Sequence, residues 1–335
     1  MTQDMNQKKN QLPINIEKEI LIKDEAEGHY GKNPYERTID ELIKFGVINL
    51  NKPEGPTSHQ VASYVRDIIG IKTGHSGTLD PQVSGVLPIG TGKATRLMHY
   101  LLTTGKEYVG VMHLHREIEK QKIFEMAKRF TGKIKQLPPV RSSVKRRWRY
   151  RHVYYFNILE IKGKDVLFRV GVEAGTYIRK LCHDFGKALG IGAHMTHLRR
   201  TKVGFFDESN SWHLYDIKDA LWFWKNEGYE GYIRKVILPG EEAVKHIPKI
   251  WVKDPTVYYL THGGNLFVPG IVKLTSDVQA NKYVAVYTLK DELIMIGKAK
   301  LNASQILEMK KGLAVENDRV YMSQDYFPKI TEKLK

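Results

Sequence analysis

The sequence predicts an α+β body of roughly 200 residues followed by a compact, mostly β module of about 80 residues. Up to about residue 235, stretches with helical spacing of apolar residues alternate with stretches of strict two-residue alternation. Beyond residue 250 the chain turns to short strands separated by glycines, with little helix. The 335 residues, 41% of them hydrophobic, suffice for two cores.

The first elements of the body follow from apolar spacing and from residues that start or stop a helix. A helical pattern near Asp40 leads into a short strand at 47–50 and then a proline- and glycine-rich turn. Ser58 is expected to cap the next helix, which Gly70 ends. Helical spacing returns over residues 94–102.

Two-residue alternation begins at Glu107. The expected strand 107–115 places Tyr108, Met112 and Leu114 on one face. Residues 153–161 and 165–174 alternate around a Lys-Gly-Lys turn, which is typical of a β-hairpin. The remaining expected elements are helices at 123–130, 178–189 and 217–224, and strands at 283–287 and 293–296.

The N-terminal segment, residues 1–37, is polar and has no sustained period. It is expected to form either a tail or an extended strap over the folded body. We place the body at residues 38–240 and the β module at residues 247–328.

Charge is the strongest compositional signal. A net charge of +16 with a pI near 9.5 favours a polyanionic partner, and nucleic acid fits best. A membrane partner is disfavoured because no run approaches the roughly 18 apolar residues of a spanning helix. The first twenty residues lack the apolar core of a secretory signal, and the single Cys182 excludes an internal disulfide. We expect a soluble, intracellular protein that binds nucleic acid.

One carboxylate lies in a run of turn-forming residues, His75-Ser76-Gly77-Thr78-Leu79-Asp80-Pro81, between two helical patterns. Gly77 permits unusual backbone angles and Pro81 fixes its own φ, so this segment would hold Asp80 at a set angle. From these residues alone, Asp80 could equally serve only to close a turn.

Two further polar stretches lie where regular elements begin: Lys106-Glu107-Tyr108-Val109-Gly110 and Gly175-Thr176-Tyr177-Ile178-Arg179. Taken singly, Tyr108 and Tyr177 could be ordinary core aromatics. Arg179 is different, because a cation at a helix start opposes the helix dipole unless an anion pairs with it. Asp80 is the obvious partner, and a bidentate pair would keep its carboxylate ionised and aimed.

A strongly basic loop follows Pro138-Pro139. It contains one tryptophan and the cations Arg141, Lys145, Arg146, Arg147, Arg149 and Arg151. Such a loop suits RNA phosphates, and its guanidinium groups and indole can stack on bases. A merely solvated charged face is the alternative interpretation.

Other candidate sites are weaker. The pairs His113/His115 and His194/His197, the second expected on a turn, have no nearby cysteine or acidic cluster, so structural or surface roles are favoured over metal binding. The Gly90-Thr91-Gly92-Lys93 run lacks the full spacing of a nucleotide phosphate loop. Cys182 falls in the apolar stripe of its helix and is expected to be buried.

Together, the Asp80, Tyr108 and Arg179 stretches resemble, in order and separation, the motifs of the TruB-type pseudouridine synthases. The C-terminal module resembles a PUA RNA-binding domain through His262-Gly263-Gly264-Asn265-Leu266-Phe267. With the long N-terminal extension, the arrangement is most similar to the dyskerin-type catalytic subunits of archaeal box H/ACA ribonucleoproteins. The resemblance extends over about residues 38–327. It implies a mixed, mostly antiparallel catalytic sheet and a β-barrel-like PUA domain.

The resemblance also implies roles for individual residues in converting uridine to pseudouridine, with no cofactor and no metal. Asp80 would attack the nucleoside, at the ribose or at the base, and Arg179 would accompany it. Tyr108 would stack on the uracil and assist proton removal. His75, Tyr177 and Leu198 would bind the extruded nucleotide. The basic loop would close on substrate RNA, and the PUA domain, including Gly263 and Gly264, would hold the guide RNA.

The implied partners are a box H/ACA guide RNA, substrate rRNA or tRNA, small Nop-type and Gar-type core proteins, and a kink-turn-binding ribosomal-like protein. Lysine-rich tails typical of the nucleolar eukaryotic proteins are missing, which favours an archaeal, cytoplasmic protein. The chain departs from many relatives at Val83-Ser84, interpreted as packing variation, and residues 117–121 receive no role. Two alternatives remain: a stand-alone tRNA pseudouridine synthase, and a non-catalytic RNA scaffold.

Overall fold

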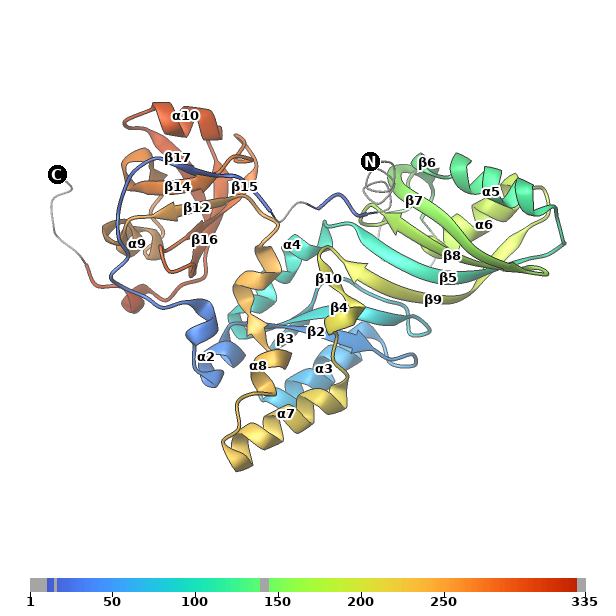
Figure 1. Ribbon diagram of the computed structural model, residues 1–335, viewed down its shortest axis with the longest axis horizontal. Helices are drawn as coiled ribbons and strands as arrows, with labels where there is room; N and C mark the ends of the chain where they lie inside the picture. The colour runs from blue at the N-terminus through green and yellow to red at the C-terminus, as the bar shows by residue number, and fades with distance from the viewer. Residues whose placement is uncertain (1–10, 15–16, 139–144, 330–335) are drawn as a thin grey trace, which may run out of the picture. The chain divides into compact units, whose positions relative to one another are not determined.

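The computed structural model describes residues 11–14, 17–138 and 145–329 (Figure 1). Their contacts divide the chain into two compact units. The first contains Ile48–Gly90 and Met98–Val236, together with residues 11–14. The second contains Thr91–Leu97 and residues 17–47 and 237–329. Each is described by itself below.

The first unit is built on a sheet whose strands run in the order β2-β4-β9-β5-β8-β7-β6. The β4–β9 pairing is parallel, while the pairs among β5, β6, β7, β8 and β9 are antiparallel, as expected for a mixed, mostly antiparallel sheet. β3 pairs with β4, and β10 pairs with β9. The strands are β2 (Gly46–Lys52), β3 (Thr73–His75), β4 (Ser84–Thr91), β5 (Lys106–Leu114), β6 (Gly132–Gln136), β7 (Arg149–Lys162), β8 (Asp165–Val172), β9 (Ala193–Val203) and β10 (Phe206–Asp207).

The helices of this unit are α3 (Ser58–Ile69), α4 (Met98–Leu102), α5 (Lys120–Arg129), α6 (Ile178–Ala188), α7 (Leu214–Glu227) and α8 (Ile233–Val236). Helices α5 and α6 cover one face of the sheet (Figure 1). Ile123 of α5 and Leu181 and Phe185 of α6 share a core with Met112 and Phe168 of the strands. The alternation that sends Tyr108, Met112 and Leu114 to the same side of β5 is therefore confirmed.

Three local expectations were wrong. Thr57, not Ser58, caps α3, because its hydroxyl accepts from the Gln60 N–H in a capping box. The Asp80 loop lies between strands β3 and β4 instead of between two helices. His194 and His197 lie on strand β9, not on a turn.

The second unit holds a seven-stranded sheet with the order β1-β14-β12-β15-β16-β17-β13. The β12–β15 pair is parallel and the others are antiparallel. Strand β1 pairs with β14, so part of the N-terminal segment completes this sheet. Its elements are β1 (Ile20–Ile22), α2 (Ile39–Lys44), β11 (Leu238–Pro239), β12 (Lys249–Val252), α9 (Asp254–Thr261), β13 (Leu266–Phe267), β14 (Ile271–Thr275), β15 (Tyr283–Tyr287), β16 (Leu293–Ala299), α10 (Ala303–Glu308) and β17 (Leu313–Val320).

The α+β class and the largely β C-terminal module are as the sequence predicts. Among the described residues, no helix combines the length and apolar character needed to span a membrane.

Candidate active site

The loop that carries Asp80 is fixed through its main chain. The hydroxyl of Ser58, freed from capping α3, accepts from the Leu79 N–H at 2.8 Å and donates to the Leu79 carbonyl at 3.1 Å. The buried ammonium of Lys52 donates to the carbonyls of Pro81 at 3.2 Å and Val83 at 2.9 Å. Burial lowers the pKa of Lys52. The backbone on both sides of Asp80 is thus anchored, while its carboxylate stays 58% exposed.

Arg179 meets Asp80 as expected. Helix α6 begins at Ile178 with Tyr177 at its N-cap, which puts Arg179 in the first turn. Its Nη2 lies 2.8 Å from the Asp80 Oδ2, across 99 residues of sequence. The contact is made through one nitrogen and is not the bidentate pair that was expected. Both groups are more than half exposed, so a substrate can reach the carboxylate.

Tyr108 and Leu198 lie in the same unit as this pair. They project from β5 and β9 on the same side, and each is 8% exposed. A Cβ on Gly110 would lie 2.8 Å from Leu198 Cδ1, so the glycine makes room for Leu198 next to Tyr108. Both belong to the same core cluster as Leu79 and Ile178, the chain neighbours of Asp80 and Arg179. The structure therefore pairs Asp80 with Arg179, and it places all four predicted residues in or next in sequence to one core of the first unit.

His75 and Tyr177 complete the set. His75 ends β3, and its Nδ1 accepts a hydrogen bond from the Gly77 N–H at 3.3 Å. Burial and the nearby charges of Arg200 and His59 lower the pKa of His75, so the imidazole is neutral at pH 7. Tyr177 is half-buried at the start of α6. Both lie in the same unit as Asp80.

The predicted basic loop leads into a hairpin in which cations and aromatic rings alternate. Arg141 lies outside the described residues. Lys145, Arg146 and Arg147 are exposed, and Arg149 opens β7. Antiparallel pairing of β6 with β7 sets Lys133 4.3 Å from the Tyr150 ring centre and Lys135 5.0 Å from that of Trp148.

Lys133 and Lys135 were missed in the sequence, although the Lys-Ile-Lys alternation after Gly132 indicates two cations on one face. Exposed cations stacked on exposed aromatic rings form a surface suited to a nucleic-acid strand.

Gly263 and Gly264 follow helix α9 in the second unit. Gly263 has a φ of +90° with open space around it, which closes the helix in a turn. A Cβ on Gly264 would lie 2.7 Å from the Tyr259 carbonyl oxygen. Asn317 donates to the Gly264 carbonyl at 3.0 Å and holds this turn against β17.

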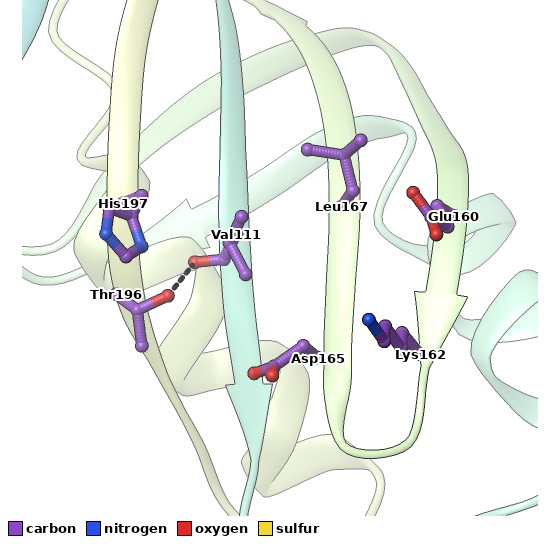
Figure 2. A pocket seen from close by; sticks show the side chains of 7 residues that line it. All are labelled: Val111, Glu160, Lys162, Asp165, Leu167, Thr196 and His197. Carbon is purple, nitrogen blue, oxygen red and sulfur yellow. Dashed lines mark hydrogen bonds between the residues drawn. The ribbon is translucent and has the colours of Figure 1, made fainter.

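Figure 2 shows a pocket of about 460 Å³ on the sheet. Val111, which lines it, is three residues after Tyr108 on β5, so the pocket lies on the opposite face from Tyr108. It contains none of the predicted site residues. Its lining residues are Val111, Glu160, Lys162, Asp165, Leu167, Thr196 and His197.

The histidines near this pocket have polar partners of their own. His113 Nδ1 lies 2.7 Å from Asp165, and His115 Nε2 lies 3.1 Å from His194 Nδ1. Within the part of the chain that the structure describes, no cluster of ligating side chains could hold a metal ion.

Two fully buried cations near the site were not anticipated: Lys52 and Arg200. Both lie in strands and donate to main-chain oxygens of the Asp80 loop or of β4. Their partners are main-chain carbonyl groups, which every residue carries. The sequence therefore contains no acidic partner residue from which these two buried cations could be predicted.

Family models match most of the chain. The model of the TruB family pseudouridylate synthase N-terminal domain matches residues 66–123, and that of the tRNA pseudouridylate synthase B C-terminal domain matches residues 179–245. A DKCLD domain model matches residues 9–62, and a PUA domain model matches residues 248–321.

Individual relatives extend this likeness over nearly the full length. A probable tRNA pseudouridine synthase B of Nanoarchaeum equitans is 54% identical over 95% of this chain and 92% of its own. One of Pyrococcus furiosus is 53% identical over 96% of both chains. A chain from the crystal structure of a Cbf5-Nop10-Gar1 complex superposes with a TM-score of 0.91 at 52% identity, and covers 96% of this chain and 99% of its own.

A chain from an H/ACA RNP bound to a substrate RNA containing 2'-deoxyuridine gives a TM-score of 0.90 at 50% identity, with the same coverage. The chain therefore belongs to the TruB family of pseudouridine synthases, in its dyskerin-type branch with a DKCLD domain and a C-terminal PUA domain.

Proposed function

We propose that the protein is the catalytic subunit of a box H/ACA ribonucleoprotein and isomerises uridine to pseudouridine in rRNA and tRNA under the direction of a guide RNA. The observation that carries this proposal is the full-length likeness, at TM-scores of 0.91 and 0.90, to chains in a Cbf5-Nop10-Gar1 complex and in a substrate-bound H/ACA RNP.

The catalytic group is Asp80, whose exposed carboxylate attacks the nucleoside. The N-glycosidic bond breaks, the uracil turns and is rejoined through carbon, and the proton on that carbon leaves. Arg179, 2.8 Å away, orients the carboxylate. Tyr108 stacks on the base and assists removal of the proton. His75, Tyr177 and Leu198 bind the nucleotide after it leaves its helical stack.

RNA binding is assigned to two surfaces. The exposed cations Lys145, Arg146 and Arg147, with Arg149 and Arg141, contact substrate phosphates. The turn at Gly263 and Gly264, in the domain of residues 247–328, contacts the guide RNA. The catalytic domain is assigned to residues 38–240 and the N-terminal extension to residues 1–37.

The proposed box H/ACA ribonucleoprotein also contains Nop10-type and Gar1-type proteins and a kink-turn-binding protein. The relatives from Nanoarchaeum and Pyrococcus support an archaeal particle, and hence a cytoplasmic one.

A stand-alone tRNA pseudouridine synthase is the second candidate, and the curated names of the relatives favour it. Both candidates use the same catalytic residues. They differ in whether bare tRNA is a substrate.

Turnover separates the two candidates. The protein is incubated with a bare tRNA transcript, and separately with a target RNA plus an H/ACA guide and the partner proteins. A guided enzyme should form pseudouridine only in the second mixture. Efficient turnover of bare tRNA without a guide would contradict the guided function. RNA recovered from the native protein should contain guides with an ACA end. An absence of turnover in both mixtures, with RNA still bound, would leave only the scaffold role.

A further inference from the structure

Among the residues that the structure describes, Arg200 is the largest fully buried side chain. It lies on β9, is 1% exposed, and no carboxylate contacts it among the described residues. Burial lowers the pKa of Arg200 below its ordinary value, while the phenol of Tyr108 acts in the opposite direction. A guanidinium still keeps its proton at neutral pH. Burying a cation without a carboxylate partner costs desolvation free energy, so a buried arginine at this position suggests a specific role.

The acceptors of this cation converge on the candidate active site. Arg200 Nε donates to the Val86 carbonyl at 2.8 Å, and Nη2 is 3.4 Å from the Gly77 carbonyl, in the loop that carries Asp80. Tyr108 is the cross-strand partner of Arg200 in the β5–β9 pair, so the two side chains leave the sheet on the same side. The guanidinium therefore connects the Asp80 loop to strand β4 beside Tyr108.

Gly85 on β4 makes room for this arrangement. A Cβ on Gly85 would lie 2.1 Å from the Arg200 carbonyl oxygen, and Gly85 has a φ of +109°. A larger residue there would push β4 and β9 apart. Gly77 has a φ of +133°, a backbone conformation that favours glycine in the Asp80 loop.

Hydrogen-bond capacity defines what the cation can do beside Tyr108. A guanidinium can only donate, so in a hydrogen bond between these two side chains the phenol oxygen of Tyr108 accepts. The phenol O–H and the second lone pair are then directed elsewhere. Tyr108 lies on β5, which pairs with β8 and β9, and its exposed fraction is only 8%.

We propose that Arg200 is a positioning residue that fixes the orientation of the Tyr108 hydroxyl and its placement relative to Asp80. This inference rests on the proposed role of Tyr108 in pseudouridine formation. The cation touches no substrate and acts through Tyr108. Its positive field also favours electron density on the phenol oxygen as a proton moves.

The test uses Arg200→Lys, which keeps the charge but loses the fork, with Arg199→Lys as the matched control. Arg199 is the next residue on β9, but it is partly exposed and pairs with Glu208 at 2.7 Å. Single-turnover rates are measured as tritium release from RNA labelled at C5 of uridine, using whichever substrate the wild-type protein turns over. RNA affinity and melting temperature are measured alongside.

For Arg200→Lys we expect a rate about 100-fold below wild type, with RNA affinity within a few-fold and a melting temperature close to that of Arg199→Lys. A second measurement combines Arg200→Lys with Tyr108→Phe, which removes the hydroxyl. The double variant should then be no slower than Tyr108→Phe alone.

Three results would overturn the proposal: a wild-type rate for Arg200→Lys, a fall in melting temperature that accounts for its loss of rate, or full additivity on Tyr108→Phe. If Tyr108→Phe itself reacts at the wild-type rate, the assignment of Tyr108 fails first. If Tyr108→Phe has no measurable turnover, the double variant gives no information. The proposal then stands only if Arg200→Lys lowers the rate while RNA affinity and melting temperature stay as expected.

Discussion

The side-chain amide of Gln136 and the main chain of Tyr177 exchange two hydrogen bonds: the Tyr177 N–H donates to Oε1 at 3.1 Å, and Nε2 donates to the Tyr177 carbonyl at 3.3 Å. Gln136 is 3% exposed and ends β6, at the base of the basic hairpin. Tyr177 is the N-cap of α6, two residues before Arg179. The basic hairpin and the helix that carries Arg179 are thus joined at one buried amide.

Gln136→Ala should therefore lower both stability and turnover. It leaves the Tyr177 N–H without its partner, while the Tyr177 carbonyl keeps the bond from the Leu181 N–H at 2.9 Å. An unpaired buried N–H costs about 1–3 kcal/mol of unfolding free energy. Urea unfolding and single-turnover rates measure the two effects. Gln121→Ala, which removes an exposed amide bonded to Glu125, serves as the control and should change neither. Equal stability of the two variants would show that the buried amide contributes nothing.

Asp80→Asn should abolish pseudouridine formation while RNA affinity stays within a few-fold. The amide keeps the size of the carboxylate but is a poor nucleophile. Asp67→Asn is the matched control, because Asp67 also pairs with an arginine, Arg66, in an exposed position. Product is measured by C5 tritium release, and affinity by filter binding. Pseudouridine formed by the Asn variant would show that Asp80 is not the nucleophile.

Neutralising Arg146 and Arg147 together should slow turnover and flatten the salt dependence of RNA binding. Both are exposed at the hairpin that carries the stacked Lys135 and Trp148. Each lost phosphate contact reduces the slope of log K against log salt by about 0.7–0.9. The double alanine variant is compared with Lys120→Ala/Lys122→Ala, which removes the same charge from α5. An unchanged slope would mean that this loop does not touch phosphate.

The elements that sequence reasoning found are those with a one-sided apolar pattern. Leu181 and Phe185 mark the buried face of α6, and the alternation of β5 was evident from Tyr108 onward. Strand β4 was missed because its residues are buried on both faces and include glycine and proline, so no alternation remains. Strand β9 was missed because histidine, threonine and arginine alternate along it in place of apolar residues.

Within the candidate site, what was predictable depended on chemistry visible along the chain. The unpaired charge of Arg179 at a helix start indicated an anion, and Asp80 in its rigid loop was the natural choice. Lys52 and Arg200 could not be found in this way, since a cation satisfied by carbonyl oxygens needs no particular partner residue. Ser58 was recognised as polar at a helix start, but the choice between capping α3 and holding Leu79 is decided only by the fold.

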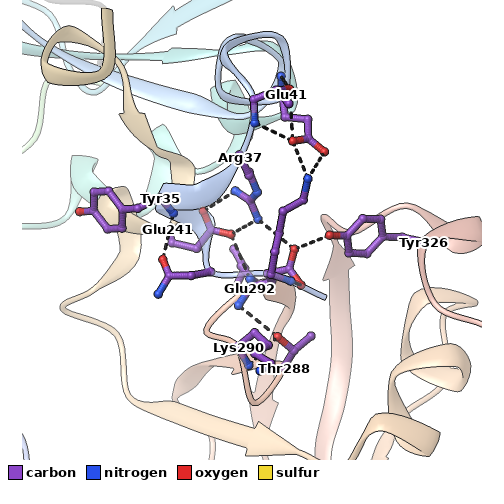
Figure 3. A network of polar contacts seen from close by, with 12 residues as sticks. Tyr35, Arg37, Glu41, Glu241, Thr288, Lys290, Glu292 and Tyr326 are labelled. Carbon is purple, nitrogen blue, oxygen red and sulfur yellow. Dashed lines mark hydrogen bonds and ion pairs between the residues drawn. The ribbon is translucent and has the colours of Figure 1, made fainter. Parts of the chain in front are cut away.

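A second buried network lies in the unit that contains the PUA domain (Figure 3). Arg37 makes a bidentate pair with Glu241, with both nitrogen–oxygen distances at 2.8 Å. The carboxylate of Glu292, 1% exposed, is 3.8 Å from Arg37 and accepts from the Tyr326 hydroxyl at 2.9 Å. Burial raises the pKa of Glu292, while Tyr326 and Arg37 act against that rise. This cluster attaches the N-terminal segment to Glu292, the residue before strand β16, and to Tyr326 near the C-terminal end of the described chain.

Arg37→Met should destabilise this unit by about 3–5 kcal/mol at pH 7, because it leaves two buried carboxylates without their cation. Loss of Arg37 raises the folded-state pKa of Glu292 further above its ordinary value of 4.5. Between those two values the folded state binds more protons than the unfolded state, so stability falls as the pH rises through this window. The deficit of the variant should therefore be largest at neutral pH and shrink toward pH 4. Urea unfolding across this range measures it against Arg66→Met, whose exposed ion pair with Asp67 should contribute almost nothing at any pH. A deficit that stays constant with pH would show that Glu292 does not depend on the charge of Arg37.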